Sequence, residues 1–117
     1  GGFDAKAIAL RPMDDPDGWN VLQQKLGEPI PQGATVHVSA EIRADNPEMA
    51  VLKFVWWNKE GEQFKQKLQT VAGQFETVEL DIDLPDDEGG VATVQVLRRP
   101  NVEGELLVKS VSVKIPE

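Results

Sequence analysis

The chain has 117 residues, a length typical of one domain that buries roughly two thirds of the surface exposed by its unfolded form. Its 40% hydrophobic and 27% charged residues exclude a wholly disordered segment, and the absence of cysteine excludes disulfides and thiolate chemistry. A net charge of −8 argues against nucleic acid as a partner, and we expect no membrane insertion because no apolar run reaches the ~20 residues of a spanning helix.

Most apolar segments are short, alternate with period two and end in turn residues, which is typical of strands. In the first half of the chain the predicted strands occupy residues 5–10, 19–26, 34–44 and 51–57, and the segment GEPIPQG at 27–33 is a loop. The third strand has the clearest pattern, because apolar residues hold every even position from Val36 to Ile42 and polar residues hold the odd ones. One face of that strand is therefore expected to be buried.

The second half begins with the turn NKEG at 58–61, where Gly61 can adopt the positive φ that closes a hairpin. Further strands are predicted at 62–71, 75–84, 91–98 and 106–115, and Pro85 ends the second of these. About eight strands with no convincing helix and no internal repeat predict an all-β fold. The architecture is then an antiparallel two-sheet β-sandwich or a barrel.

The adjacent tryptophans Trp56 and Trp57 point to opposite faces of their strand. Trp56 shares its parity with apolar residues and is expected in the core, whereas Trp57 shares the face of Lys53. An exposed indole can stack on the flat C–H face of a sugar ring, so Trp57 is a candidate ligand-binding residue; alternatively it covers the hairpin or an edge. Trp19 either flanks the same face or anchors the loop before it.

Polar partners for a sugar would come from the solvated faces of the strands, since amide, carboxylate and cationic groups make bidentate contacts with vicinal hydroxyls. Any one of them can equally be an ordinary outward-facing residue of an antiparallel sandwich. The candidates are Lys53, Gln95 with Thr93, Arg98, Gln24, and Glu79 with Asp81.

Two acidic loops are candidate calcium sites, because calcium takes six to eight oxygen ligands. The first contains Asp14, Asp15 and Asp17, and the second extends from Asp81 to Glu88. Neither has the twelve-residue spacing of an EF-hand, and acidic turns are also common solvated connectors. The first loop is the preferred candidate, with calcium as a possible cofactor.

Catalytic motifs are lacking in the sequence. His37 is the single histidine, and Ser39 and Glu41 follow it at alternate positions of one strand. Such side chains are about 7 Å apart, too far for a hydrogen-bonded nucleophilic relay. We therefore predict that the chain is not an enzyme.

Several segments together resemble the jelly-roll carbohydrate-binding modules of the galactose-binding-like group, which accompany extracellular glycoside hydrolases. They are GWNVLQQKLGEPIPQGATVHVSAEIRA, FVWWNKEGE, GQFETVELDIDLP and GELLVKSVSVKIPE, and they cover nearly the whole chain. The closing strand departs from the family, holding Lys109 and Ser110 where many members have an acidic pair near a structural calcium. His37 likewise stands where tyrosine is common.

The resemblance implies a jelly-roll β-sandwich acting as a non-catalytic accessory domain that binds a polysaccharide or other glycan. It also implies an extracytoplasmic location, whether secreted, periplasmic or at the cell surface. We interpret residues 1–117 as one domain excised from a larger protein. The alternative is a structural or protein-interaction module that has a protein partner and no sugar ligand.

Overall fold

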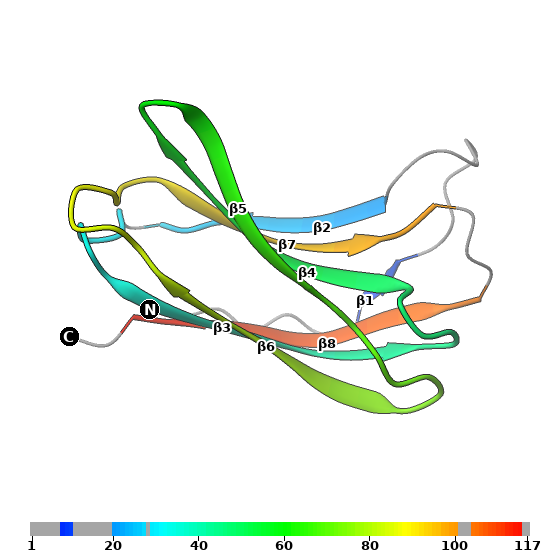
Figure 1. Cartoon of the computed structure of the whole chain (residues 1–117). Coiled ribbons are helices and arrows are strands. Elements are labelled where there is room, and N and C mark those ends of the chain that lie inside the picture. The colour runs from blue at the N-terminus through cyan, green and yellow to red at the C-terminus, as the bar shows by residue number, and fades with distance from the viewer. Residues whose placement is uncertain (1–7, 11–19, 28, 101–103, 116–117) are drawn as a thin grey trace.

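The computed structural model describes residues 8–10, 20–27, 29–100 and 104–115. Within these ranges the chain forms eight strands and the predicted positions are largely confirmed (Figure 1). The strands are β1 (Ile8–Leu10), β2 (Asn20–Lys25), β3 (Thr35–Ala44), β4 (Ala50–Asn58), β5 (Gly61–Leu68), β6 (Phe75–Asp83), β7 (Ala92–Arg98) and β8 (Leu106–Lys114).

The strands form two four-stranded antiparallel sheets, ordered β1-β8-β3-β6 and β2-β7-β4-β5, which are stacked as a sandwich in Figure 1. The pairs β1–β8, β2–β7, β3–β6 and β4–β5 are nested, as in one long hairpin rolled up so that successive pairs alternate between the sheets. This is the jelly-roll topology. The predicted all-β, two-sheet sandwich is confirmed, and the barrel is excluded.

The core lies between the sheets and is built from the alternating apolar positions of the strands. In β3 the residues Val36, Val38, Ala40 and Ile42 are fully buried, and their polar neighbours face outward. From the opposite sheet Phe54 meets them without solvent exposure. Within the described ranges no helix is long and apolar enough to cross a membrane.

Strand β5 ends earlier than predicted, at Leu68 rather than at residue 71. The next residue, Gln69, is fully buried and its side chain bonds to the backbone of two other segments. Its amide oxygen accepts hydrogen bonds from the N–H groups of Met49 and Ala50, and its nitrogen donates to the carbonyls of Asn46 and Val71. The backbone N–H of Gln69 still donates to the carbonyl of Ala50 at 2.9 Å, so these side-chain bonds add to the β4–β5 pairing at the end of the strand.

The β4–β5 hairpin has the predicted tight turn. Asn58 pairs with Gly61, whose φ is 111°, a backbone conformation that a residue with a Cβ rarely adopts. The side-chain oxygen of Asn58 also accepts a hydrogen bond from the N–H of Glu60. The turn holds the end of β4, and with it Trp57, in a defined position.

Candidate functional site

The two adjacent tryptophans lie on opposite faces of β4, as the alternation predicts. Trp56 faces inward and packs against the core, its ring centroid 5.9 Å from that of Phe54. Trp57 faces outward with 43% of its surface exposed. The pair therefore combines one packing residue with one that is accessible to a ligand.

Trp57 lines an open pocket of about 380 Å³ at one end of the sandwich. The pocket lies between the tip of the β4–β5 hairpin and the loop that follows β6, two segments that lie at the same end of the molecule in Figure 1. Its lining combines an indole, an amide and carboxylates, which are groups able to stack on a ring and to bond its hydroxyls. The lining residues are Trp57, Asn58, Lys59, Glu60, Pro85, Asp87, Glu88 and Gly89.

A hydrogen bond connects the two walls of the pocket. The amide nitrogen of Asn58, on the hairpin, donates to the carboxylate of Glu88, on the loop. The amide oxygen of Asn58 accepts from Gln63 at 3.5 Å in addition to the N–H of Glu60. Asn58 is thereby oriented from both sides, so the polar wall beside Trp57 is organised before any ligand arrives.

The loop at 85–90, which forms the second wall of the pocket, is hydrogen-bonded to the backbone of residues 30–33. Ile30 and Gly90 exchange two backbone hydrogen bonds of 2.8 and 2.7 Å, and Gly33 donates to the carbonyl of Glu88 at 3.0 Å. Gly89 packs so closely that a Cβ at its position would lie 2.6 Å from the carbonyl oxygen of Ile30. Only glycine allows this approach, and the approach sets the position of the acidic loop.

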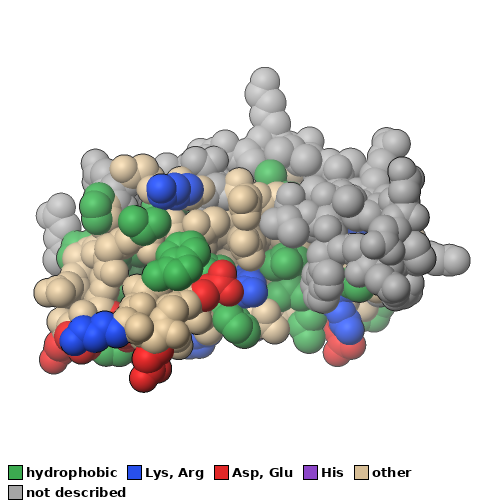
Figure 2. All heavy atoms as spheres, turned by 90° about the horizontal axis from the view of Figure 1, so that it is seen from above, with side chains coloured by type: hydrophobic (Ala, Val, Ile, Leu, Met, Phe, Trp, Pro, Cys, Tyr) green, Lys and Arg blue, Asp and Glu red, His purple; other side chains and the backbone are tan. Residues whose placement is uncertain are grey.

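Trp57, which lines the pocket, also belongs to the outer face of the β2-β7-β4-β5 sheet, the side of the molecule that Figure 2 views from above. Phe64 lies there, opposite Val55 in the register and 53% exposed. The ammonium of Lys53 stands 4.2 Å from the centre of the Phe64 ring. Hydrophobic and polar side chains are thus interleaved on this face.

Two predicted residues, Lys53 and Gln95, do share the outer face with Trp57. They are directly opposite each other in the β4–β7 register, and Gln95 donates to Gln23 on β2 at 3.1 Å. Thr93 has the same parity as Gln95 and lies on this face as well. The structure therefore brings these three residues to the side of the sandwich that carries Trp57.

Two other predicted residues do not join this set. Glu79 lies on β6 and faces outward from the opposite sheet, so the thickness of the sandwich separates it from Trp57. Arg98, expected on a solvated face, is only 2% exposed and donates to the carbonyls of Arg99 and Gly104. Burial lowers the pKa of Arg98 from its ordinary value. That expectation was wrong because Arg98 continues the inward parity of β7 and closes the end of the core.

The remaining predicted residues cannot be placed. Trp19 and the acidic residues Asp14, Asp15 and Asp17 lie outside the described residues, and of Gln24 only the backbone position in β2 is described. Among the side chains that the structure does describe, no group of three or more His, Cys, Asp or Glu is arranged to hold a metal ion. The second acidic loop, including Asp87, therefore forms no such cluster.

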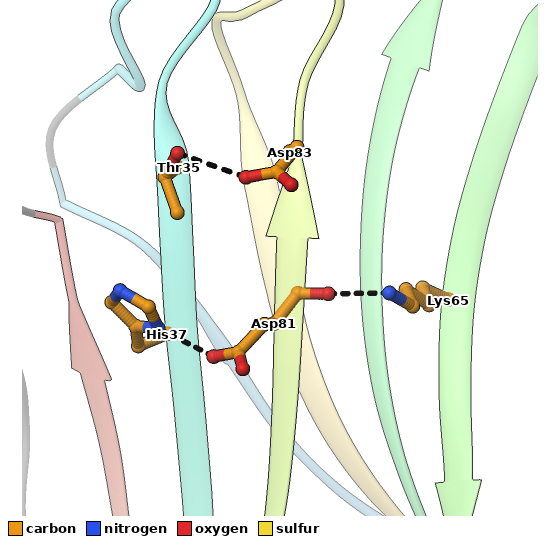
Figure 3. Close-up of polar contacts among 5 residues, drawn as sticks. All are labelled: Thr35, His37, Lys65, Asp81 and Asp83. Atoms are coloured by element: carbon orange, nitrogen blue, oxygen red, sulfur yellow. Dashed lines mark hydrogen bonds and ion pairs between the residues drawn. The ribbon is translucent and has the colours of Figure 1, made fainter.

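His37 lies on the outer face of the other sheet and pairs across strands rather than along its own strand (Figure 3). Its Nδ1 bonds to the carboxylate of Asp81 on β6. Thr35 and Asp83 form the next outward-facing pair of the same two strands, and the Thr35 hydroxyl donates to the Asp83 carboxylate at 2.9 Å. Lys65 of β5 donates to the carbonyl oxygen of Asp81, so it links the edges of the two sheets. These bonds pin the edge strand β6, and His37 is not paired with the hydroxyl of Ser39 in any described contact.

Sequence comparison identifies no relative: no known family model matches the chain, and no curated protein matches it. Solved structures are similar in fold. The enzymatically active domain of tailspike protein 4 from Bacteriophage CBA120 has a TM-score of 0.72 at 10% identity, with 94% of this chain and 15% of that one covered. A CBM4 structure has a TM-score of 0.68 at 14% identity, covering 98% and 78%. A family 16 carbohydrate-binding module has a TM-score of 0.68 at 10% identity, covering 92% and 75%.

At these identities the likeness establishes the fold and nothing finer. The chain has the jelly-roll sandwich found in several carbohydrate-binding modules, and it spans only a small part of the tailspike domain. The structure also adds residues that strand alternation did not single out. Phe64 and Asn58 were not predicted as site residues, and Asp87 and Glu88 were considered only as calcium ligands.

A cross-strand reading of the hairpin would have found Phe64. With the turn at 58–61, Phe64 falls opposite Val55 and so on the face of Trp57. No local signal would have found the loop at 85–89, because it meets the hairpin through the stacking of two different sheets.

Proposed function

We propose that this domain is a non-catalytic carbohydrate-binding module that holds a glycan by stacking a sugar ring on Trp57. Asn58, Asp87 and Glu88 supply hydrogen-bonding groups at the rim. Lys53 and Gln95 extend the polar contacts along the sheet. The observation that carries this proposal is the exposed indole of Trp57 in an open pocket lined by an amide and carboxylates.

The size of the stacking interaction follows from the exposed area of Trp57. The exposed 43% of a side chain of ~200 Å² leaves about 90 Å² to be covered by a ligand. At ~25 cal/mol per Å² this contributes about 2 kcal/mol, or about 30-fold in Kd. This is the share of the binding free energy that stacking on Trp57 alone would contribute.

The fold comparisons support the same class of function, since two of the similar structures are carbohydrate-binding modules. The galactose-binding-like subgroup, the extracytoplasmic location and the attachment of this domain to a larger protein belong to the proposal. A structural or protein-interaction role is the alternative, in which Trp57 packs against a protein partner.

The test is a glycan array and affinity electrophoresis on three proteins: wild type, Trp57→Ala and Phe75→Ala. Phe75 is a matched control because it is 41% exposed on the outer face of the opposite sheet. We expect the Trp57 variant to lose about 30-fold in affinity for a bound glycan and the Phe75 variant to retain wild-type affinity.

The proposal fails if no glycan binds the wild type, or if both variants bind a glycan as tightly as wild type does. Thermal unfolding of each protein accompanies the binding assay, so that a loss of affinity is not confused with a loss of the fold.

A further inference from the structure

The lining of the Trp57 pocket has an excess of negative charge. Glu60, Asp87 and Glu88 contribute three carboxylates, and Lys59 is the single cation among the lining residues. The whole chain carries the same sign, with a formal charge of −8. A ligand entering the pocket therefore meets a negative potential from the pocket and from the molecule together.

The loop backbone and the carboxylate of Glu88 are held in place beside the pocket. Glu88 accepts from Asn58, its N–H donates to the carbonyl of Pro85 at 2.9 Å, and its own carbonyl accepts from Gly33. Asp87 is the neighbouring residue in this anchored loop and its side chain is exposed. Among the described contacts Asp87 has no ion pair or hydrogen bond that would neutralise it or occupy its oxygens.

An ionised carboxylate accepts hydrogen bonds and donates none. Neutral sugar hydroxyls can donate to Asp87 and Glu88, so they complement this wall. A uronate or sulfate group offers only acceptors and a negative charge, so it would face like charge across the pocket. The loop wall is therefore chemically better suited to neutral sugars than to acidic ones.

We propose that the pocket selects uncharged sugar units and rejects uronates and sulfated sugars, with Asp87 as the specificity-determining residue. This inference rests on the proposed glycan-binding function and adds the chemical class of the ligand. Trp57 supplies affinity for any pyranose ring, and Asp87 decides which rings are accepted.

The experiment uses immobilised oligosaccharides in matched pairs that differ only in their terminal unit: glucose against glucuronate, and galactose against galacturonate. Galactose and its 6-sulfate form a third pair. Wild type, Asp87→Asn and Glu79→Gln are compared at low salt and in 0.5 M NaCl, an ionic strength at which roughly 4 Å of screening length remains. Glu79→Gln is the matched control, since it removes the same charge from the opposite sheet face.

We expect wild type and Glu79→Gln to bind the neutral member of a pair at least about tenfold more tightly than its acidic partner at low salt. In Asp87→Asn the preference for the neutral sugar should fall below about threefold. In wild type, added salt should reduce the same preference because it screens the carboxylates.

Equal or tighter wild-type binding of the acidic members would overturn the selectivity and leave glycan binding intact. An equal change in Glu79→Gln and Asp87→Asn would overturn the role of Asp87, because net charge alone would then explain the effect. An array on which wild type binds no glycan would overturn both the selectivity and the proposed function.

Discussion

Gln69 offers a direct test of how the two connections at 45–49 and 69–74 are held to each other. It is fully buried, and its amide oxygen accepts from the N–H groups of Met49 at 3.0 Å and Ala50 at 3.2 Å. Leucine at position 69 has nearly the same volume and no hydrogen-bonding group. Gln69→Leu would leave both N–H groups buried without these partners, and the carbonyls of Asn46 and Val71 would also lose a donor.

Each buried N–H left without a partner costs about 1–3 kcal/mol, so we expect Gln69→Leu to lower the free energy of unfolding by about 4 kcal/mol. That is a large share of the 5–15 kcal/mol typical of a domain, and it corresponds to a drop in Tm of about 15 °C. Urea unfolding followed by tryptophan fluorescence measures the loss as a shift in midpoint at constant slope.

Gln66→Leu is the matched control, because Gln66 is an exposed residue of β5. Its effect should stay within about 0.5 kcal/mol. A loss of less than about 1 kcal/mol in Gln69→Leu would refute the reasoning, since the two N–H groups would then be satisfied in another way.

Three further predictions concern other parts of the molecule. Burial raises the pKa of the Glu76 carboxyl group. Hydrogen bonds from Val71 and Thr70, together with the charge of Lys67, lower this pKa by more, so that it lies below the ordinary value of 4.5. Stability from this carboxylate is therefore present above pH 4.5 and lost as the pH falls through the lower folded pKa, so Glu76→Gln should flatten the decline in urea midpoint below pH 4.5. Gly89→Ala forces a Cβ against backbone and should cost about 2 kcal/mol, whereas Gly27→Ala, with nothing within 4 Å, should stay within about 1 kcal/mol by thermal unfolding. Acrylamide should quench wild-type fluorescence more strongly than that of Trp57→Phe; equal quenching would contradict the exposure of the Trp57 indole.

The strands could be read from the sequence because each depends on local alternation. In β3 and β6 the apolar residues recur at every second position, and the burial of Val36 and Val78 follows the same parity. The turn at Gly61 could be predicted from an equally local signal. The burial of Arg98 could not, since a charged residue at the end of an apolar strand can either face solvent or be buried at the end of the core.

Part of the candidate site could also be predicted from local alternation. Alternation alone separated the core residue Trp56 from the exposed Trp57, because neighbouring side chains on a strand point to opposite faces.

What the sequence by itself determined is the set of strands, their buried faces and the outward direction of Trp57, all of which follow from a two-residue period. Only the tertiary structure decided which strands share a sheet. It thereby placed Glu79 on the opposite sheet from Trp57 and placed Gln95 on the same outer face as Trp57. It also decided that the loop carrying Asp87 meets the β4–β5 hairpin. The physical reason is that these contacts depend on which strands pair and how the sheets stack, and both are set by the burial of the whole core rather than by any local pattern.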